Sequence, residues 1–191
     1  IDGETPAYIA ASKGYDLVLE ELLNANVDMY KATRNGATPA YVAAEQGHAS
    51  VITLFAERGV RLDKRNGQGE TLALVAAQRG HGLVLRALST AGEDLNEAAR
   101  DGTGTTPAYI AAANGHAEVI QTLADLGVNL SMSLPLKGDE TPAHIAAQQG
   151  HVEVINALHK GEADLNTLDR ERCTPAYVAA YYNRVEVIRA L

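Results

Sequence analysis

The chain has 191 residues, 46% apolar and 21% charged, a composition typical of a folded globular protein that argues against disorder. Its 24 acidic against 16 basic residues give a net charge of −8, so nucleic acid and anionic membranes are unfavourable partners. The single cysteine, Cys173, excludes an intrachain disulfide and favours a reducing compartment, the cytoplasm or the nucleus. No apolar run is long enough to predict membrane insertion.

One short phrase occurs six times along the chain. Residues 5–11 read Thr-Pro-Ala-Tyr-Ile-Ala-Ala, and related phrases begin at Thr38, Thr71, Thr106, Thr141 and Thr174. Successive copies are 33 or 35 residues apart, and this regular spacing indicates a repeat architecture. We therefore predict a single domain over residues 1–191, with a truncated last repeat. The repeats start near Gly3, Gly36, Gly69, Gly104, Asp139 and Arg172.

Each copy predicts two short helices and a loop. The threonine is a favoured N-cap and the following proline suits the first helical position, so the first helix begins there and continues through the Ala-Ala pair. Apolar residues at helical spacing then predict a second helix, as in residues 51–55 and 119–123. A polar stretch leads to the next threonine and predicts a loop. Between the two helices, five copies carry a helix-ending glycine: Gly14, Gly47, Gly80, Gly115 and Gly150.

Thr-Pro, then Ala-Ala, Gly-His, Val-Ile and Leu, at a period near 33, resembles the ankyrin repeat over essentially the whole chain. The resemblance implies an all-α solenoid of stacked helix-turn-helix units, from which β-hairpin-like loops, here called fingers, project. It also implies binding of a partner protein on the concave side, without catalysis and without a cofactor.

The sequence departs from the family after the Thr-Pro pair, where Leu-His is usual. Four copies have Ala-Tyr instead, one has Ala143-His144 and one has Ala73-Leu74. We interpret the change as an exchange of volume, in which tyrosine fills space that leucine leaves. The alternative is an aromatic ladder that binds a ligand. The tyrosines of this column are Tyr8, Tyr41, Tyr109 and Tyr177.

Histidine and cysteine raise the question of a metal or catalytic site. Four of the six histidines follow the helix-ending glycine at one repeat position, so they are spread along the solenoid and favour a structural role over a metal site. They are His48, His81, His116 and His151. Arg170 and Arg172 could lower the pKa of Cys173, but no catalytic partner is evident and we expect a surface cysteine.

In the ankyrin family the ligand-facing positions flank the fixed residues of each repeat. The positions before the threonine give Arg34, Asn35, Gln68, Glu70, Lys137, Glu140 and Arg170. The positions after the Ala-Ala pair give Lys13, Glu45, Gln46, Gln78, Arg79, Asn114, Gln148, Gln149, Tyr181 and Tyr182. The two tyrosines either bind a partner or lie against a missing seventh repeat. One finger is unusually apolar, and its Met132, Leu134 and Leu136 either contact a partner or pack against the protein itself.

We expect a non-catalytic interaction module, the scaffold or targeting domain of a larger intracellular protein. An alternative is a substrate-recruiting region of an enzyme, or of a secreted bacterial effector acting in the host cytoplasm, whose catalytic domain lies outside this chain. A spacer without a ligand is a third possibility. Because Val187, Ile188 and Leu191 should be exposed at the end of the stack, we expect further repeats or domains in the full-length protein.

Overall fold

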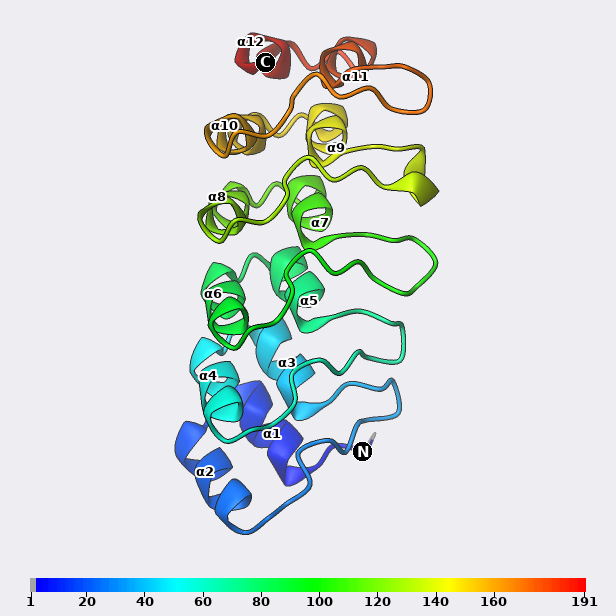
Figure 1. Ribbon diagram of the computed structural model, residues 1–191. Coiled ribbons are helices and arrows are strands. Elements are labelled where there is room, and N and C mark those ends of the chain that lie inside the picture. The colour runs from blue at the N-terminus through cyan, green and yellow to red at the C-terminus, as the bar shows by residue number, and fades with distance from the viewer. Residues whose placement is uncertain (1–2) are drawn as a thin grey trace.

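A computed structural model describes residues 3–191 as a stack of six helix pairs. Figure 1 shows the odd-numbered helices in one column and the even-numbered helices in a second, with the fingers projecting from the odd-numbered side. The inner helices are α1 (Pro6–Lys13), α3 (Pro39–Gln46), α5 (Leu72–Arg79), α7 (Pro107–Ala113), α9 (Pro142–Gln149) and α11 (Pro175–Tyr181). The outer helices are α2 (Asp16–Asn24), α4 (Ala49–Glu57), α6 (Gly82–Thr90), α8 (Ala117–Asp125), α10 (Val152–Lys160) and α12 (Val185–Ala190). The predicted all-α solenoid is confirmed.

Every inner helix begins directly after its threonine, as the sequence predicts. In five of the six, the threonine Oγ1 accepts a hydrogen bond from the backbone N–H three residues later, for example from Tyr8 to Thr5 at 3.1 Å. At Thr141 the backbone N–H instead donates to Nδ1 of His144, at 3.1 Å. Each helix start thus has a local partner for a backbone group that would otherwise be unpaired.

The glycine that ends an inner helix is required for two reasons. Gly14 has a φ of 67°, in the left-handed region that disfavours other residues. A Cβ atom there would lie 2.6 Å from Nδ1 of His48 in the next repeat, which is too close for any side chain. The glycine of one repeat therefore packs against the histidine of the next, as Gly14 does against His48. In the last repeat Asn183, with a φ of 56°, takes the glycine position.

The predicted repeat starts share one backbone conformation. Gly36 has a φ of 80°, and a Cβ atom there would lie 2.3 Å from the backbone nitrogen of Gly67 in the next finger. Gly3, Gly69 and Gly104 are also left-handed. Asp139 and Arg172 adopt the same conformation with φ of 62° and 63°, although they have side chains.

The core lies between the two helix columns. The Ala-Ala pairs of the inner helices are buried, except for Ala180 in α11, and their small side chains let neighbouring inner helices pack closely. Residues 51, 52, 54 and 55 of α4 are buried, and so is Leu123 of α8, as the pattern predicts. The expectation for Val187 is wrong: it is only 1% exposed because α12 turns it toward the stack, whereas Ile188 and Leu191 are exposed.

The fingers are linked to one another by backbone hydrogen bonds. Gly67 N–H donates to Asn35 O at 3.1 Å, and Arg170 N–H donates to Gly138 O at 2.8 Å. Arg65 adds a side-chain link, since its guanidinium donates to backbone carbonyls of its own and the following finger and pairs with Glu97. No helix within residues 3–191 is long and apolar enough to cross a membrane.

Candidate functional site: the inner face

The candidate site is the inner face, defined as the exposed positions at the ends of the inner helices together with the fingers. The helix positions are fixed by the repeat, because in α1, α3, α5, α7 and α9 the Ala-Ala pair just before them is buried and the next two residues then emerge at the surface. Exposed members of this set are Lys13, Gln46, Gln78, Arg79, Asn114, Gln149, Tyr181 and Tyr182. Glu45 and Gln148 are half-buried.

Several inner-face side chains contact the neighbouring repeat. Arg79 donates to Glu45 at 2.8 Å, and the arginine side chain remains 55% exposed. The Gln148 amide donates to the Tyr182 hydroxyl at 3.1 Å, and the Tyr182 ring lies edge-on to Tyr181 with centroids 5.2 Å apart. These contacts link α3 to α5 and the end of α9 to the end of α11.

The predicted finger positions lie at the surface, but some are already engaged. Arg34, Asn35, Gln68 and Arg170 are exposed and Lys137 is half-buried. Arg170 donates to the backbone oxygen of Pro135 at 2.7 Å and pairs with Asp139. Lys137 Nζ lies 5.4 Å from the ring centroid of Tyr109, in a cation–π contact.

The tyrosine column packs inside the stack and also bridges repeats. Tyr41 and Tyr109 are buried, and their hydroxyls donate to Oε2 of Glu70 at 2.6 Å and of Glu140 at 2.7 Å. Both acceptors are the residue before the threonine of the next repeat. The pKa of each tyrosine lies far above its ordinary value. Burial is the largest cause, and the hydrogen bond to the carboxylate is the second. These residues support the packing interpretation rather than a ligand-binding ladder.

The tyrosine column differs in repeats where no acidic residue precedes the threonine of the next repeat. His144 takes the tyrosine position in its repeat, and its Nε2 donates to the Cys173 backbone oxygen at 3.0 Å. Tyr8 is half-buried, and the residue before the threonine of the next repeat is Ala37, which has no acceptor side chain; Tyr177 in the last repeat is 59% exposed. A signal for these bridges was present in the sequence, as an acid before the next threonine, but sequence analysis missed it. The Glu70 carboxylate oxygen Oε2 also accepts a hydrogen bond from Asn66, so Glu70 has two partners within the protein.

In the apolar finger, one leucine packs against the protein itself and the other is open to a partner. Leu134 is only 2% exposed and joins the core, so as a partner contact it is excluded. Its N–H donates to Glu140 O at 2.8 Å, and a 3-10 turn, Pro135–Lys137, follows. This turn leaves Leu136 68% exposed at the tip, and Met132 is half-buried. Leu136 therefore remains available to a partner.

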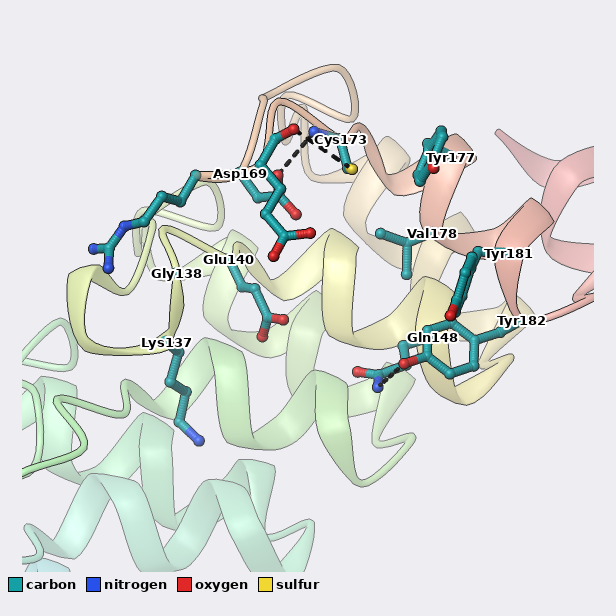
Figure 2. A pocket seen from close by; sticks show the side chains of 12 residues that line it. Lys137, Gly138, Glu140, Gln148, Asp169, Cys173, Tyr177, Val178, Tyr181 and Tyr182 are labelled. Atoms are coloured by element: carbon teal, nitrogen blue, oxygen red, sulfur yellow. Dashed lines mark hydrogen bonds between the residues drawn. The ribbon is translucent and has the colours of Figure 1, made fainter.

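A hollow of about 630 Å³ lies at the C-terminal end of the inner face. Figure 2 shows that two successive fingers, α9 and α11 contribute to it. Its walls include side chains that sequence analysis did not select as binding residues. These are Asp169, Glu171, Cys173, Tyr177 and Val178.

The expectation for Cys173 needs a correction. Burial, followed by the negative charges of Asp169 and Glu171, raises the pKa of the Cys173 thiol rather than lowering it. Arg170, one of the two arginines near Cys173 in sequence, instead donates to the Pro135 backbone oxygen and pairs with Asp139. A raised pKa disfavours the thiolate and with it nucleophilic chemistry at neutral pH.

The histidines after the helix-ending glycines have a structural role. Each donates from Nε2 to a backbone oxygen of the preceding repeat, for example His81 to Glu45 O at 3.0 Å. In the last repeat Arg184 makes the equivalent bond, from Nε to Gln148 O at 2.9 Å. Across residues 3–191 no three His, Cys, Asp or Glu side chains are grouped so that they could hold a metal ion.

Comparisons with known proteins agree with this architecture. The family model for ankyrin repeats matches in three copies, over residues 1–66, 54–133 and 129–191. No curated protein matches the sequence. Among solved structures, the fold is similar to a chain in the complex of the Bd0816 predatory endopeptidase from Bdellovibrio bacteriovorus with the immunity protein Bd3460. The TM-score is 0.80 at 23% identity, covering 98% of this chain and 97% of that chain. The chain therefore belongs to the ankyrin repeat family, whose repeats are protein–protein interaction modules.

Proposed function

We propose that this protein is a non-catalytic module that binds a partner protein on its inner face, the concave side of the solenoid. It would serve as a scaffold or targeting region of a larger protein in the cytoplasm or nucleus. The observation that carries the proposal is the division of labour within the inner helices. In the four internal inner helices, α3, α5, α7 and α9, the first residues and the Ala-Ala pair pack within the stack, whereas the next two positions present side chains at the surface.

A protein partner also fits the charge and the comparisons. The net charge of −8 disfavours nucleic acid as a ligand. The solved structure with a similar fold holds an endopeptidase together with an immunity protein, so this architecture occurs in a complex between two proteins. The exposed tyrosines Tyr181 and Tyr182 support the same class of ligand, since tyrosine is enriched at the energetic centres of protein interfaces.

The test is to isolate a partner by pull-down with these repeats and mass spectrometry, and then to measure its affinity for purified variants. We expect Arg79→Glu or Tyr181→Ala to weaken binding by more than about 1 kcal/mol. Arg86→Glu is the matched control. Like Arg79, Arg86 is an exposed arginine with one carboxylate partner in a neighbouring repeat, Asp125 at 2.7 Å, but it lies on the outer helix α6.

The outcome against the proposal is equally definite. If both inner-face variants bind like the wild type while Arg86→Glu abolishes binding, the partner docks on the outer helices and the inner-face assignment is wrong. Circular dichroism of each variant separates lost contacts from lost folding.

A further inference from the structure

The hollow at the C-terminal end of the inner face combines negative charge with aromatic walls. Glu140 from one finger and Asp169 and Glu171 from the next bring three carboxylates to it. On the other side lie Tyr177, Val178 and Tyr181 of α11, and Tyr182 directly after this helix. Carboxylates offer charge-assisted hydrogen bonds to a cation, and aromatic faces attract a cation through their π electrons.

The two cations at the rim do not neutralise these carboxylates. Arg170 is held by Asp139 and by the backbone oxygen of Pro135, and Lys137 lies over the Tyr109 ring. Figure 2 shows the Lys137 side chain directed away from the tyrosines of α11.

The carboxylates retain capacity for a further donor. Within residues 3–191, no ion pair involves Glu140, Asp169 or Glu171. Asp169 accepts one bond, from the Cys173 N–H at 2.8 Å, and Glu140 accepts one at Oε2 from Tyr109, so each has a second oxygen to offer.

We propose that this hollow receives a lysine or arginine side chain of the partner protein. The inference rests on the proposed function and names the chemistry of one contact within it. The cationic head would lie between the carboxylates of the two fingers, and the apolar stem would pack against Val178 and the rings of α11. A volume of about 630 Å³ admits a whole side chain and part of the backbone that carries it.

The experiment begins with a library of random linear peptides displayed on phage and selected on the purified protein. We expect the selected peptides to share one lysine or arginine at a fixed position. The best peptide, labelled with a fluorophore, is then titrated by fluorescence polarisation. Replacing its shared basic residue with norleucine keeps the stem, removes the charge and should weaken binding roughly tenfold.

Variants of the protein locate the contact. Glu140→Gln and Glu171→Gln should each weaken binding of the basic peptide roughly tenfold. They should weaken binding of the norleucine peptide far less. Tyr181→Ala should weaken binding of the basic peptide about threefold. Glu70→Gln is the matched control for Glu140→Gln, because Glu70 accepts the same tyrosine bond in another repeat, outside the hollow. Glu153→Gln, on the outer helix α10, is the control for Glu171→Gln.

The outcomes separate this inference from the proposed function. If peptides are selected without a basic residue, or if both glutamate variants bind like their controls, the cation site is wrong while protein binding on the inner face stands. A loss on Tyr181→Ala alone would mean that the tyrosines form an apolar contact, and it too would overturn the cation site. If no peptide and no partner binds the wild type, the proposed function itself fails.

Discussion

The hydrogen bond between Tyr109 and Glu140 should make a measurable contribution to stability. Tyr109→Phe keeps the buried ring and its contact with Lys137 and removes only the hydroxyl, which donates to Glu140 at 2.7 Å. Bonds to a charged group contribute about 1.5–3 kcal/mol, and since the Glu140 carboxylate is half-exposed, water replaces part of the lost bond. We therefore expect a loss of about 1.5 kcal/mol in the free energy of unfolding.

Urea unfolding followed by circular dichroism measures this loss. Tyr177→Phe is the matched control, since Tyr177 occupies the same column but is exposed, and its hydroxyl makes no hydrogen bond to any of residues 3–191. We expect the control to change stability by less than about 0.5 kcal/mol. Equal effects from the two substitutions would refute the bridge between repeats.

The same bridge predicts a dependence on alkaline pH. Burial and the bond to Glu140 raise the pKa of Tyr109 above its ordinary value of 10.0, so the folded protein keeps this proton at a pH where the unfolded chain has lost it. The stabilisation is complete below pH 10 and is lost progressively above it. The difference in stability between the wild type and Tyr109→Phe should therefore narrow as the pH rises from about 9 to 11. A constant difference would contradict the raised pKa.

Three further substitutions test the stack by the same urea assay. Leu123→Ala should cost about 2–5 kcal/mol because Leu123 is fully buried in α8, and a loss below about 1 kcal/mol would mean that the helix register is wrong. Thr106→Ala should cost about 1 kcal/mol through loss of the N-cap, whereas Thr106→Ser should restore most of it; equal losses would exclude the cap. Arg172→Gly should stabilise by about 0.5–1 kcal/mol because it relieves a left-handed residue, and a destabilised variant would show that the arginine side chain contributes contacts.

The fold was predictable because each repeat contains its own helix-start and helix-end signals. A threonine cap, a proline at the first turn, an Ala-Ala pair and a helix-ending glycine specify the first helix within one repeat, and the helices begin where these signals place them. The register of the final helix was harder. Val187 and Ile188 are both apolar, and only the direction of the stack decides that Val187 is the buried one.

The site was less predictable because it depends on contacts between repeats. The exposed helix positions, such as Arg79, follow from their place after the Ala-Ala pair. The Tyr41 to Glu70 bridge and the hollow join residues about one repeat or more apart, and their side chains meet only once the repeats stack. Leu134 is buried directly before a 3-10 turn, and the composition of the finger reveals neither the turn nor the burial.

The central claim is that the inner face binds a protein, and a chemical-shift map measures this most directly. A partner or selected peptide is titrated into the ¹⁵N-labelled chain, and backbone amide shifts are followed residue by residue. We expect the largest changes at the ends of the inner helices and along the fingers, around Gln78, Arg79, Tyr181 and Tyr182, with small changes in α4, α6 and α8. Changes concentrated on those outer helices instead would contradict the account.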